Sequence, residues 1–148
     1  LRALKPILDR GNTPVVIVNK LNWANSGLLA QRALEEKSLS DALEQWRKDW
    51  VTQDSAKYLS HYSAKFFYSD GDFKKWADYK TQIQAAKPKV AIDIKNVSMF
   101  GYPNARMPMV VVDFEQDYDS GALKDKMQKR QYWINENNQW KILYEGAA

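Results

Sequence analysis

The hydrophobic pattern of this chain changes its period once, at Pro88, and that change constrains the fold more than any other feature. Before Pro88, large apolar residues recur at helical spacing: Leu39, Leu43, Trp46 and Trp50 lie four, three and four positions apart, on one face of a helix. After Pro88, apolar and polar residues alternate, which is the period of a strand with one buried face. Helices followed by strands predict an α+β domain.

Three amphipathic helices are predicted between residues 38 and 88. Ser38 is the expected cap of the first helix. Asp54 begins a second, short helix, which we expect to carry Tyr58 and Tyr62, with His61 partly exposed and pointing outward or sideways. A turn at residues 69–72 leads into the third helix. Its expected inner side is formed by Phe73, Trp76, Tyr79 and Ile83.

Four strands are predicted after Pro88, over residues 90–95, from Met109 onward, over 127–135 and over 140–145. An antiparallel meander of this kind, curled over the helices, encloses a cone-shaped interior. The predicted fold is three helices packed in the concave face of a curled antiparallel four-stranded sheet. The inward residues of the second strand are expected to be Val110, Val112, Phe114, Gln116 and Tyr118.

A further short apolar strand, Thr13–Val18, precedes this domain, and a buried strand of this type needs partners on both edges.

Composition excludes several classes of protein. No apolar stretch approaches the ~20 residues of a membrane-spanning helix, and the absence of cysteine excludes disulfides and thiolate sites. The net charge is +4, of which residues 1–37 contribute +3, so the remaining chain lacks the basic face of a nucleic-acid binder.

Gln116 is the most informative polar residue because it falls between Phe114 and Tyr118 on the inward face. An unpaired amide there would cost ~1–3 kcal/mol. It either holds a polar ligand such as a peptide or glycan fragment, or bonds Tyr62, Tyr79 or a helix backbone group and fixes the core. The candidate ligand-binding residues are Tyr62, Tyr79, Phe114, Gln116, Tyr118 and Trp133.

No catalytic residue, metal site or cofactor is predicted. The acidic row Asp113, Glu115, Asp117 and Asp119 shares one strand face, where alternate residues lie ~6.5–7 Å apart and seldom close a coordination shell. We expect these carboxylates to pair across the hairpin instead. The expected partners are Lys124, Lys126, Lys129 and Arg130.

Tyr132 and Trp133 are adjacent and point to opposite faces, so one of them is expected to lie outside or to be covered by a partner.

The spacing of the aromatic residues also carries a family resemblance. The residues concerned are Trp46, Trp50, Tyr58, Tyr62, Phe66, Trp76, Phe114, Gln116, Tyr118, Ser120, Trp140, Lys141, Ile142 and Glu145. With the order of elements, they resemble the nuclear transport factor 2-like fold in its SnoaL-like branch. Within it they are similar to the C-terminal accessory domain that follows L,D-transpeptidase-type (YkuD) domains of bacterial cell-wall enzymes. The run from Leu4 to Leu8, followed by the stretch from Gly11 to Ile17, is similar to the closing strand of a YkuD domain.

This resemblance implies that residues 1–18 are the tail of a YkuD-type catalytic domain, 19–37 a partly helical connector, and 38–148 the nuclear transport factor 2-like domain. The family's catalytic motif carries a histidine and a nucleophilic cysteine upstream of the Thr-Pro-Val stretch, whereas this chain has no cysteine and only His61. The resemblance therefore implies a noncatalytic accessory domain of a periplasmic or envelope transpeptidase or carboxypeptidase. Its expected partners are a peptidoglycan fragment or cell-wall protein and its own upstream catalytic domain.

Two other functions stay open. A small pocket enzyme of the ketosteroid isomerase or dehydratase kind can occupy the same fold. It would need an inward ionisable pair, and the expected inward residues include Tyr118 and Gln116 but no carboxylate. A homodimerisation module would instead use an exposed sheet face that carries Tyr132 or Trp133.

Overall fold

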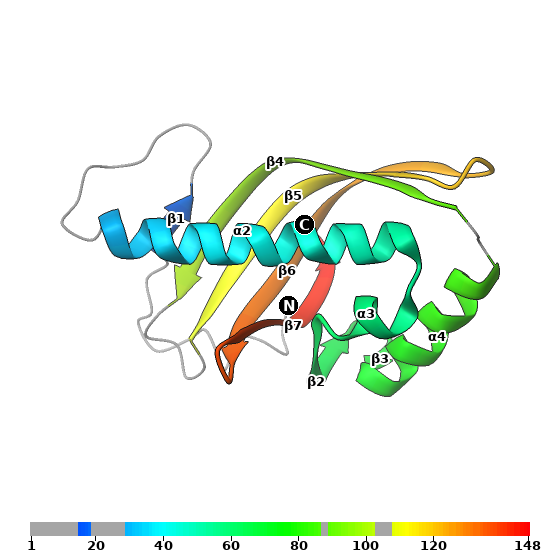
Figure 1. The fold of residues 1–148 in the computed structure, drawn as a ribbon, viewed down its shortest axis with the longest axis horizontal. Helices are drawn as coiled ribbons and strands as arrows, with labels where there is room; N and C mark the ends of the chain where they lie inside the picture. Colours follow the sequence, from blue (N-terminus) through cyan, green and yellow to red (C-terminus); the bar gives the residue numbers. More distant parts are fainter. Residues whose placement is uncertain (1–14, 19–28, 87–88, 103–107) are drawn as a thin grey trace.

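Figure 1 shows the computed structural model of the chain, which describes residues 15–18, 29–86, 89–102 and 108–148, with side-chain burial described from Glu36 onward. Its helices are α2 (Leu29–Thr52), α3 (Ser55–Leu59) and α4 (Phe73–Ala86). Its strands are β1 (Val15–Val18), β2 (Tyr62–Tyr68), β3 (Gly71–Asp72), β4 (Ala91–Tyr102), β5 (Met109–Asp119), β6 (Lys124–Glu136) and β7 (Gln139–Ala147). No helix among the described residues combines the length and the apolarity needed to cross a membrane.

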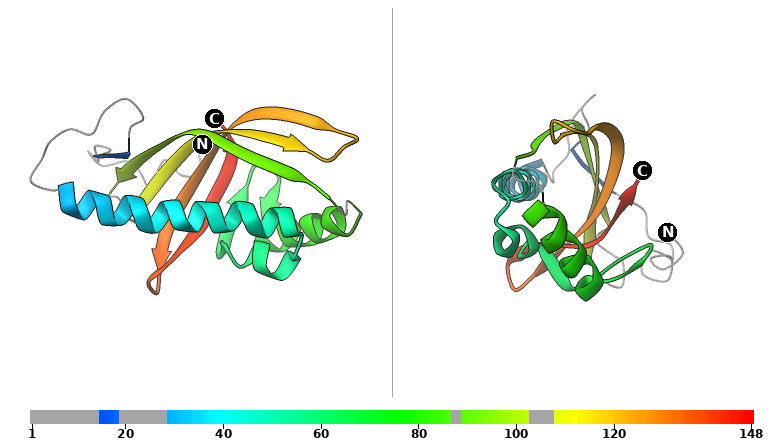
Figure 2. Two further views of the ribbon diagram at one scale, coloured as in Figure 1. Left: turned by 45° about the horizontal axis from the view of Figure 1, so that its top comes forward. Right: turned by 90° about the vertical axis from the view of Figure 1, so that its right-hand side faces the viewer.

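The strands form one curved sheet with the order β1-β4-β5-β6-β7-β2-β3. Strands β4 to β7 are the four predicted strands, and each pairs antiparallel with the next. The three helices lie on the concave side of this sheet, as the end-on view in Figure 2 shows. The predicted α+β fold is therefore confirmed. The sheet is larger than predicted because it gains β1 at one edge and β2 with β3 at the other.

Strand β2 corrects the prediction for the second helix. Helix α3 ends at Leu59, and Tyr62 opens a strand that pairs parallel with β7 opposite Ile142. The run from Phe66 to Tyr68 is rich in aromatic residues, which favour a pleated strand over a helix. The hydrogen bonding between this segment and β7 begins one residue earlier, where the Ile142 amide donates to the His61 carbonyl at 2.8 Å. His61 thus lies in the turn before β2, and its predicted place on a helix is wrong.

Helix α2 begins nine residues before Ser38, so the predicted cap at Ser38 is wrong. The segment from Leu29 to Lys37 consists of good helix formers with no glycine or proline, so nothing stops the helix there. The Ser38 hydroxyl instead accepts a hydrogen bond from the indole of Trp140. The predicted buried face of this helix, from Leu39 to Trp50, is confirmed.

Strand β1 is confirmed at Val15–Val18, but it pairs only with β4 and lies at the edge of the sheet, so the expected second partner is not found among the described strands. Other predictions fall on residues outside the described part: residues 1–14 of the predicted tail, 19–28 of the connector, and Pro88.

The sheet buries apolar residues on both faces. The concave cluster joins residues of α2, α3 and α4 to residues of β2 and of β4 to β7, and Trp133 is fully buried there. A second cluster on the convex face contains Met109, Val111, Tyr132, Ile134 and Leu143. Tyr132 packs edge-on against Tyr144 with ring centroids 5.8 Å apart, and it is 3% exposed. The expectation that Tyr132 or Trp133 lies outside is therefore wrong for this chain alone, because each face of the sheet has its own apolar cover.

The core predicts a clear contrast in stability. Phe114 is fully buried between α2 and the sheet, and Phe114→Ala should lower the free energy of unfolding by about 4 kcal/mol. Leu123→Ala, at a half-exposed site, should change it by less than about 0.5 kcal/mol. Urea unfolding followed by tryptophan fluorescence measures both, and equal losses would contradict this description of the core.

Candidate functional site

A buried carboxylate, that of Glu145 on β7, lies on the concave side of the sheet. Its Oε1 atom accepts hydrogen bonds from the Tyr62 hydroxyl at 3.0 Å and from the Gln131 amide at 2.7 Å. Its Oε2 atom lies 3.6 Å from the ammonium nitrogen of Lys129. Glu145 and Lys129 are each 6% exposed, so this is an ion pair within the core. A buried charge requires such partners, because desolvation is otherwise costly.

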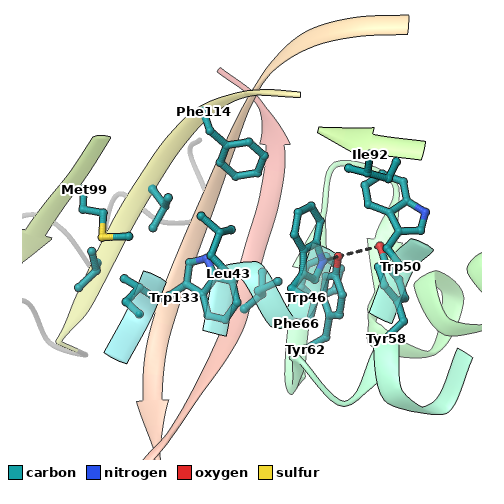
Figure 3. Packing of buried hydrophobic residues seen from close by; sticks show 14 of the residues in the cluster. Leu43, Trp46, Trp50, Tyr58, Tyr62, Phe66, Ile92, Met99, Phe114 and Trp133 are labelled. Atoms are coloured by element: carbon teal, nitrogen blue, oxygen red, sulfur yellow. Dashed lines mark hydrogen bonds between the residues drawn. The ribbon is translucent and has the colours of Figure 1, made fainter. Parts of the chain in front are cut away.

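Further polar groups extend this arrangement on either side. The Tyr62 oxygen accepts from the Trp46 indole at 3.1 Å and lies 2.9 Å from the Tyr58 oxygen. Because the Tyr62 proton points to Glu145, Tyr58 is the donor between the two phenols. On the other side, the Trp133 indole donates to the Gln131 carbonyl oxygen at 3.0 Å. Figure 3 shows the aromatic residues of this network packed between the helices and the sheet. We call the set of Tyr58, Tyr62, Lys129, Gln131 and Glu145 the Glu145 network.

Burial changes the acid–base behaviour of the two phenols. Burial, and then the negative charge of Glu145, raise the pKa of Tyr58 well above its ordinary value of 10.0. The same two causes, in the same order, raise the pKa of Tyr62. Both phenols therefore stay protonated at neutral pH, where Tyr62 donates to the Glu145 carboxylate and Tyr58 donates to the Tyr62 oxygen.

A β-bulge places Glu145 inside, and it explains why the sequence analysis found no inward carboxylate. Tyr132 pairs with Tyr144 and Trp133 with Ile142, so Leu143 is an extra residue on β7. Strict alternation from the inward Ile142 would put Tyr144 inside and Glu145 outside. The extra residue reverses that order after Leu143, and the expectation that the interior lacks a carboxylate is wrong.

Lys129 corrects a second expectation. It does not join the ion pairs on the outer face but points inward with Met127, Gln131 and Trp133, its alternate neighbours on β6. The other predicted cross-strand partners do form outer pairs: Asp113 with Arg130 at 2.7 Å, Glu115 with Lys126 at 3.4 Å, and Asp119 with Lys124 at 3.9 Å. The signal for Lys129 was present, because counting back from Trp133 in steps of two reaches it.

A pocket of about 310 Å³ opens beside the Glu145 network, between α4 and the arm formed by β5 and β6. Lys129 belongs both to its wall and to the network, whereas Glu145 lies behind Lys129 and does not line the pocket. The wall is formed by Trp50, Tyr79, Lys80, Ile83, Gln84, Gln116, Tyr118, Leu123, Asp125, Met127 and Lys129.

Two glutamines in this wall have unsatisfied amide atoms. Gln84 accepts from the Ser55 hydroxyl at 2.8 Å, but its Nε2 atom has no hydrogen-bond partner among the described residues. The Oε1 atom of Gln116 likewise has none in that part of the chain. Both side chains are about 95% buried. One spare donor and one spare acceptor thus belong to the same pocket wall.

The same wall carries two cations. The ammonium groups of Lys80 and Lys129 lie 4.7 and 5.0 Å from the Trp50 ring centroid. Each is therefore within the range of a cation–π interaction. The wall therefore combines the Lys129–Glu145 ion pair, the Lys80 ammonium and the Asp125 carboxylate with the Trp50 ring and spare amide atoms. That combination suits a polar ligand that bears a carboxylate and amide groups.

The structure separates the six predicted ligand-binding residues into two groups. Gln116, Tyr118 and Tyr79 line the pocket. Tyr62, Phe114 and Trp133 are buried in the core and do not line it. Tyr79 is 51% exposed at the rim, so its expected place on the inner side of α4 is wrong. The sequence analysis missed Lys129 and Gln84, of which Lys129 was assigned to the other face.

His61 differs from its predicted surroundings. Its Nε2 atom lies 2.7 Å from Asp49 Oδ2, and Asp49 also accepts from the Gln45 amide at 2.9 Å. The two paired side chains are only 13% and 10% exposed, so His61 is tied to α2 rather than pointing freely outward. It does not line the pocket beside the Glu145 network. Among the described residues, no three histidine or acidic side chains are grouped as a metal site.

Comparisons with known proteins agree with this architecture. Residues 38–146 match the family model described as the Cds6 C-terminal NTF2-like domain. A comparison with curated proteins gave no significant match.

Solved structures extend the comparison. The chain is similar to Bd1075 from Bdellovibrio bacteriovorus, with 21% identity, a TM-score of 0.71, and coverage of 86% of this chain and 44% of that one. It is similar to a mutant of the helical cell shape determining protein Pgp2 from Campylobacter jejuni, with 26% identity, a TM-score of 0.69, and coverage of 74% and 39%. An NTF2-like protein of unknown function from Pseudomonas putida KT2440 shares the fold, with 10% identity, a TM-score of 0.65, and coverage of 76% and 84%. The chain thus spans less than half the length of Bd1075 and Pgp2.

The ion pair within the Glu145 network predicts a non-additive effect on stability. Glu145→Gln leaves the Lys129 ammonium buried without a counter-charge and should lower the free energy of unfolding by about 3 kcal/mol. Adding Lys129→Met removes that charge and should recover part of the loss. Urea unfolding of the two single variants and the double variant measures the coupling. A double variant that loses the sum of the two single losses would contradict the pair.

The buried phenols predict a stability loss at alkaline pH. Because the pKa of Tyr58 is raised in the folded state, its stabilising contribution is complete below the ordinary pKa of 10.0 and is lost as pH rises toward the folded value. Tyr58→Phe should therefore reduce the slope of unfolding free energy against pH above pH 10.0 by up to about 1.4 kcal/mol per pH unit. Denaturant unfolding between neutral and alkaline pH tests this, and an unchanged slope would be the contrary result.

Proposed function

Because the chain belongs to the Cds6 C-terminal NTF2-like domain family, we propose that it is a noncatalytic binding module of a longer peptidoglycan-modifying protein. The module holds the peptide part of a cell-wall fragment in the pocket around Gln116. The same contact positions the fragment for a separate catalytic domain of the L,D-transpeptidase or carboxypeptidase type. Such a protein works in the periplasm or the cell envelope.

The observation that carries this proposal is the buried Oε1 atom of Gln116, which has no hydrogen-bond partner among the described residues and belongs to a pocket wall that also contains Lys129. An unsatisfied buried acceptor costs about 1–3 kcal/mol, a cost that a bound donor removes. A peptide supplies amide N–H donors for Gln116, carbonyl acceptors for Gln84, and carboxylates for the lysine side of the wall. The pocket's size of about 310 Å³ lies at the lower end of small-molecule sites. It therefore fits a few residues of peptide rather than a folded partner.

The role of the parent protein is supported by its neighbours and by composition. Pgp2, which the chain resembles over 39% of Pgp2's length, is described as a helical cell shape determining protein. The chain contains no cysteine and so has no thiol nucleophile. On this proposal, catalysis belongs to the preceding YkuD-type domain, of which residues 1–18 are the tail.

A second candidate, a small pocket enzyme, is favoured by the inward ion pair of Glu145 and Lys129. Acid–base catalysis requires a titrating group within hydrogen-bond reach of the substrate. Glu145 does not line the pocket, and its Oε1 atom already accepts two hydrogen bonds. The pair therefore supports the pocket wall better than it supports proton transfer, and binding is the preferred function.

Replacement of Gln116 tests the binding function with little risk to the fold. Gln116→Leu removes an unsatisfied buried amide, so stability should be nearly unchanged. The affinity for a soluble peptidoglycan tetrapeptide should fall about tenfold, the factor for ~1.4 kcal/mol of lost hydrogen bonding. Heteronuclear NMR titration of the labelled chain measures the affinity and maps the shifts.

The matched control is Gln128→Leu, the same change at an exposed position of β6, which should leave the affinity unchanged. Saturable shifts in the pocket that weaken only in Gln116→Leu support the proposal. The absence of shifts at millimolar peptide, or equal affinities for Gln116→Leu and the unmodified chain, would overturn it.

A further inference from the structure

A second hollow lies on the other side of Tyr79, between α4 and the β2–β3 hairpin. Its volume is about 580 Å³, and it is lined by Tyr68, Asp70, Lys75, Trp76 and Tyr79. Tyr79 lines both this hollow and the Gln116 pocket, so the two spaces are neighbours. We call it the Tyr79 hollow.

Aromatic side chains make up most of its wall. Tyr68 and Trp76 meet edge to face with ring centroids 4.9 Å apart, and Tyr79 lies 6.3 Å from Trp76. Tyr79 is one of only two large hydrophobic side chains classed as exposed in the described part of the chain. The Tyr79 ring is therefore accessible at the edge of the hollow.

Polar groups also belong to the residues of this hollow. The Trp76 indole nitrogen is buried, and no acceptor among the described residues reaches it. Asp70 is exposed, and its backbone carbonyl, rather than its carboxylate, accepts from Lys75 at 2.9 Å. The hollow therefore combines an aromatic wall with a carboxylate and an ammonium group.

These features favour a neutral, hydroxyl-rich ligand over a cation. The Trp76 ring already has the Lys80 ammonium 4.8 Å from its centroid, and Lys75 places a second positive charge at the rim. A cationic ligand would meet repulsion from both. A pyranose ring has an apolar C–H face that packs on an aromatic ring, and hydroxyls at its edge that bond to polar groups. This matches a wall of tyrosines flanked by Asp70 and Lys75.

We propose that the Tyr79 hollow is a saccharide subsite, in which a sugar ring packs on Tyr79 and Tyr68 and its hydroxyls bond the Asp70 carboxylate. The inference extends the proposed function, because a sugar here and a peptide beside Gln116 would be two parts of one fragment that passes Tyr79. It is nevertheless tested separately, since each hollow has residues that the other lacks.

The test is an NMR titration of the labelled chain with tri-N-acetylglucosamine, a neutral saccharide without peptide. The Trp76 indole N–H signal should shift in a saturable manner at millimolar sugar. Asp70→Ala and Tyr68→Leu should each weaken binding at least about threefold, as expected from the loss of one hydrogen bond or one ring contact. Asp78→Ala, an acidic position on the exposed side of α4, is the matched control and should change nothing.

The variants separate this inference from the peptide-binding function. Gln116→Leu should leave sugar binding intact, and Asp70→Ala should leave tetrapeptide binding intact. Three results would overturn the saccharide subsite. The sugar could cause no shifts, its shifts could be unchanged in both Asp70→Ala and Tyr68→Leu, or its shifts could map only to the Gln116 pocket. Shifts of Trp76 with tetramethylammonium but not with the sugar would show a cation site and would also overturn it.

Discussion

The desolvation of one carboxylate, that of Glu145, is the constraint on which the interior of this domain depends. A charge of this kind cannot be buried unless donors surround it. The surrounding donors come from β2, which supplies Tyr62, and from β6, which supplies Lys129 and Gln131. The indoles of Trp46 and Trp133 then bond to the groups that hold the carboxylate. The polar network thus joins α2, β2, β6 and β7, and a change in register of any of these elements would leave a charge or a donor without its partner.

Lys129 connects this internal constraint to the proposed site. Its ammonium group pairs with Glu145 on one side and belongs to the wall of the Gln116 pocket on the other. It also lies near Trp50, whose ring is flanked by Lys80 as well. The pocket therefore has a wall fixed by the core and a rim formed by the exposed α4. A rigid wall lowers the entropic cost of binding, because few side chains have to be ordered when a ligand enters.

Much of this architecture could be predicted from the sequence because the main elements have regular periods. The buried face of α2 and the alternation on β5, which places Gln116 inside, follow directly from spacing. The inward position of Glu145 does not, because the extra residue Leu143 shifts the alternation and a bulge leaves no local signature in one sequence.

Tyr62 was placed on a helix because the turn at residues 60–61 contains neither glycine nor proline. The parallel pairing of β2 with β7 joins segments about 80 residues apart, and no local pattern reports it. Lys129 shows a different difficulty: its alternation with Trp133 was visible, but its charge suggested the outer face.

The central claim is that the Gln116 pocket, with Lys129 in its wall, receives the peptide part of a cell-wall fragment. A crystal structure of the chain with a disaccharide tetrapeptide tests it most directly. The account predicts peptide density between α4 and the β5–β6 arm, with a ligand donor on Gln116 Oε1 and a carboxylate on the lysine side of the wall. A fragment bound elsewhere, with Gln116 turned away and side chains filling the pocket, would contradict it.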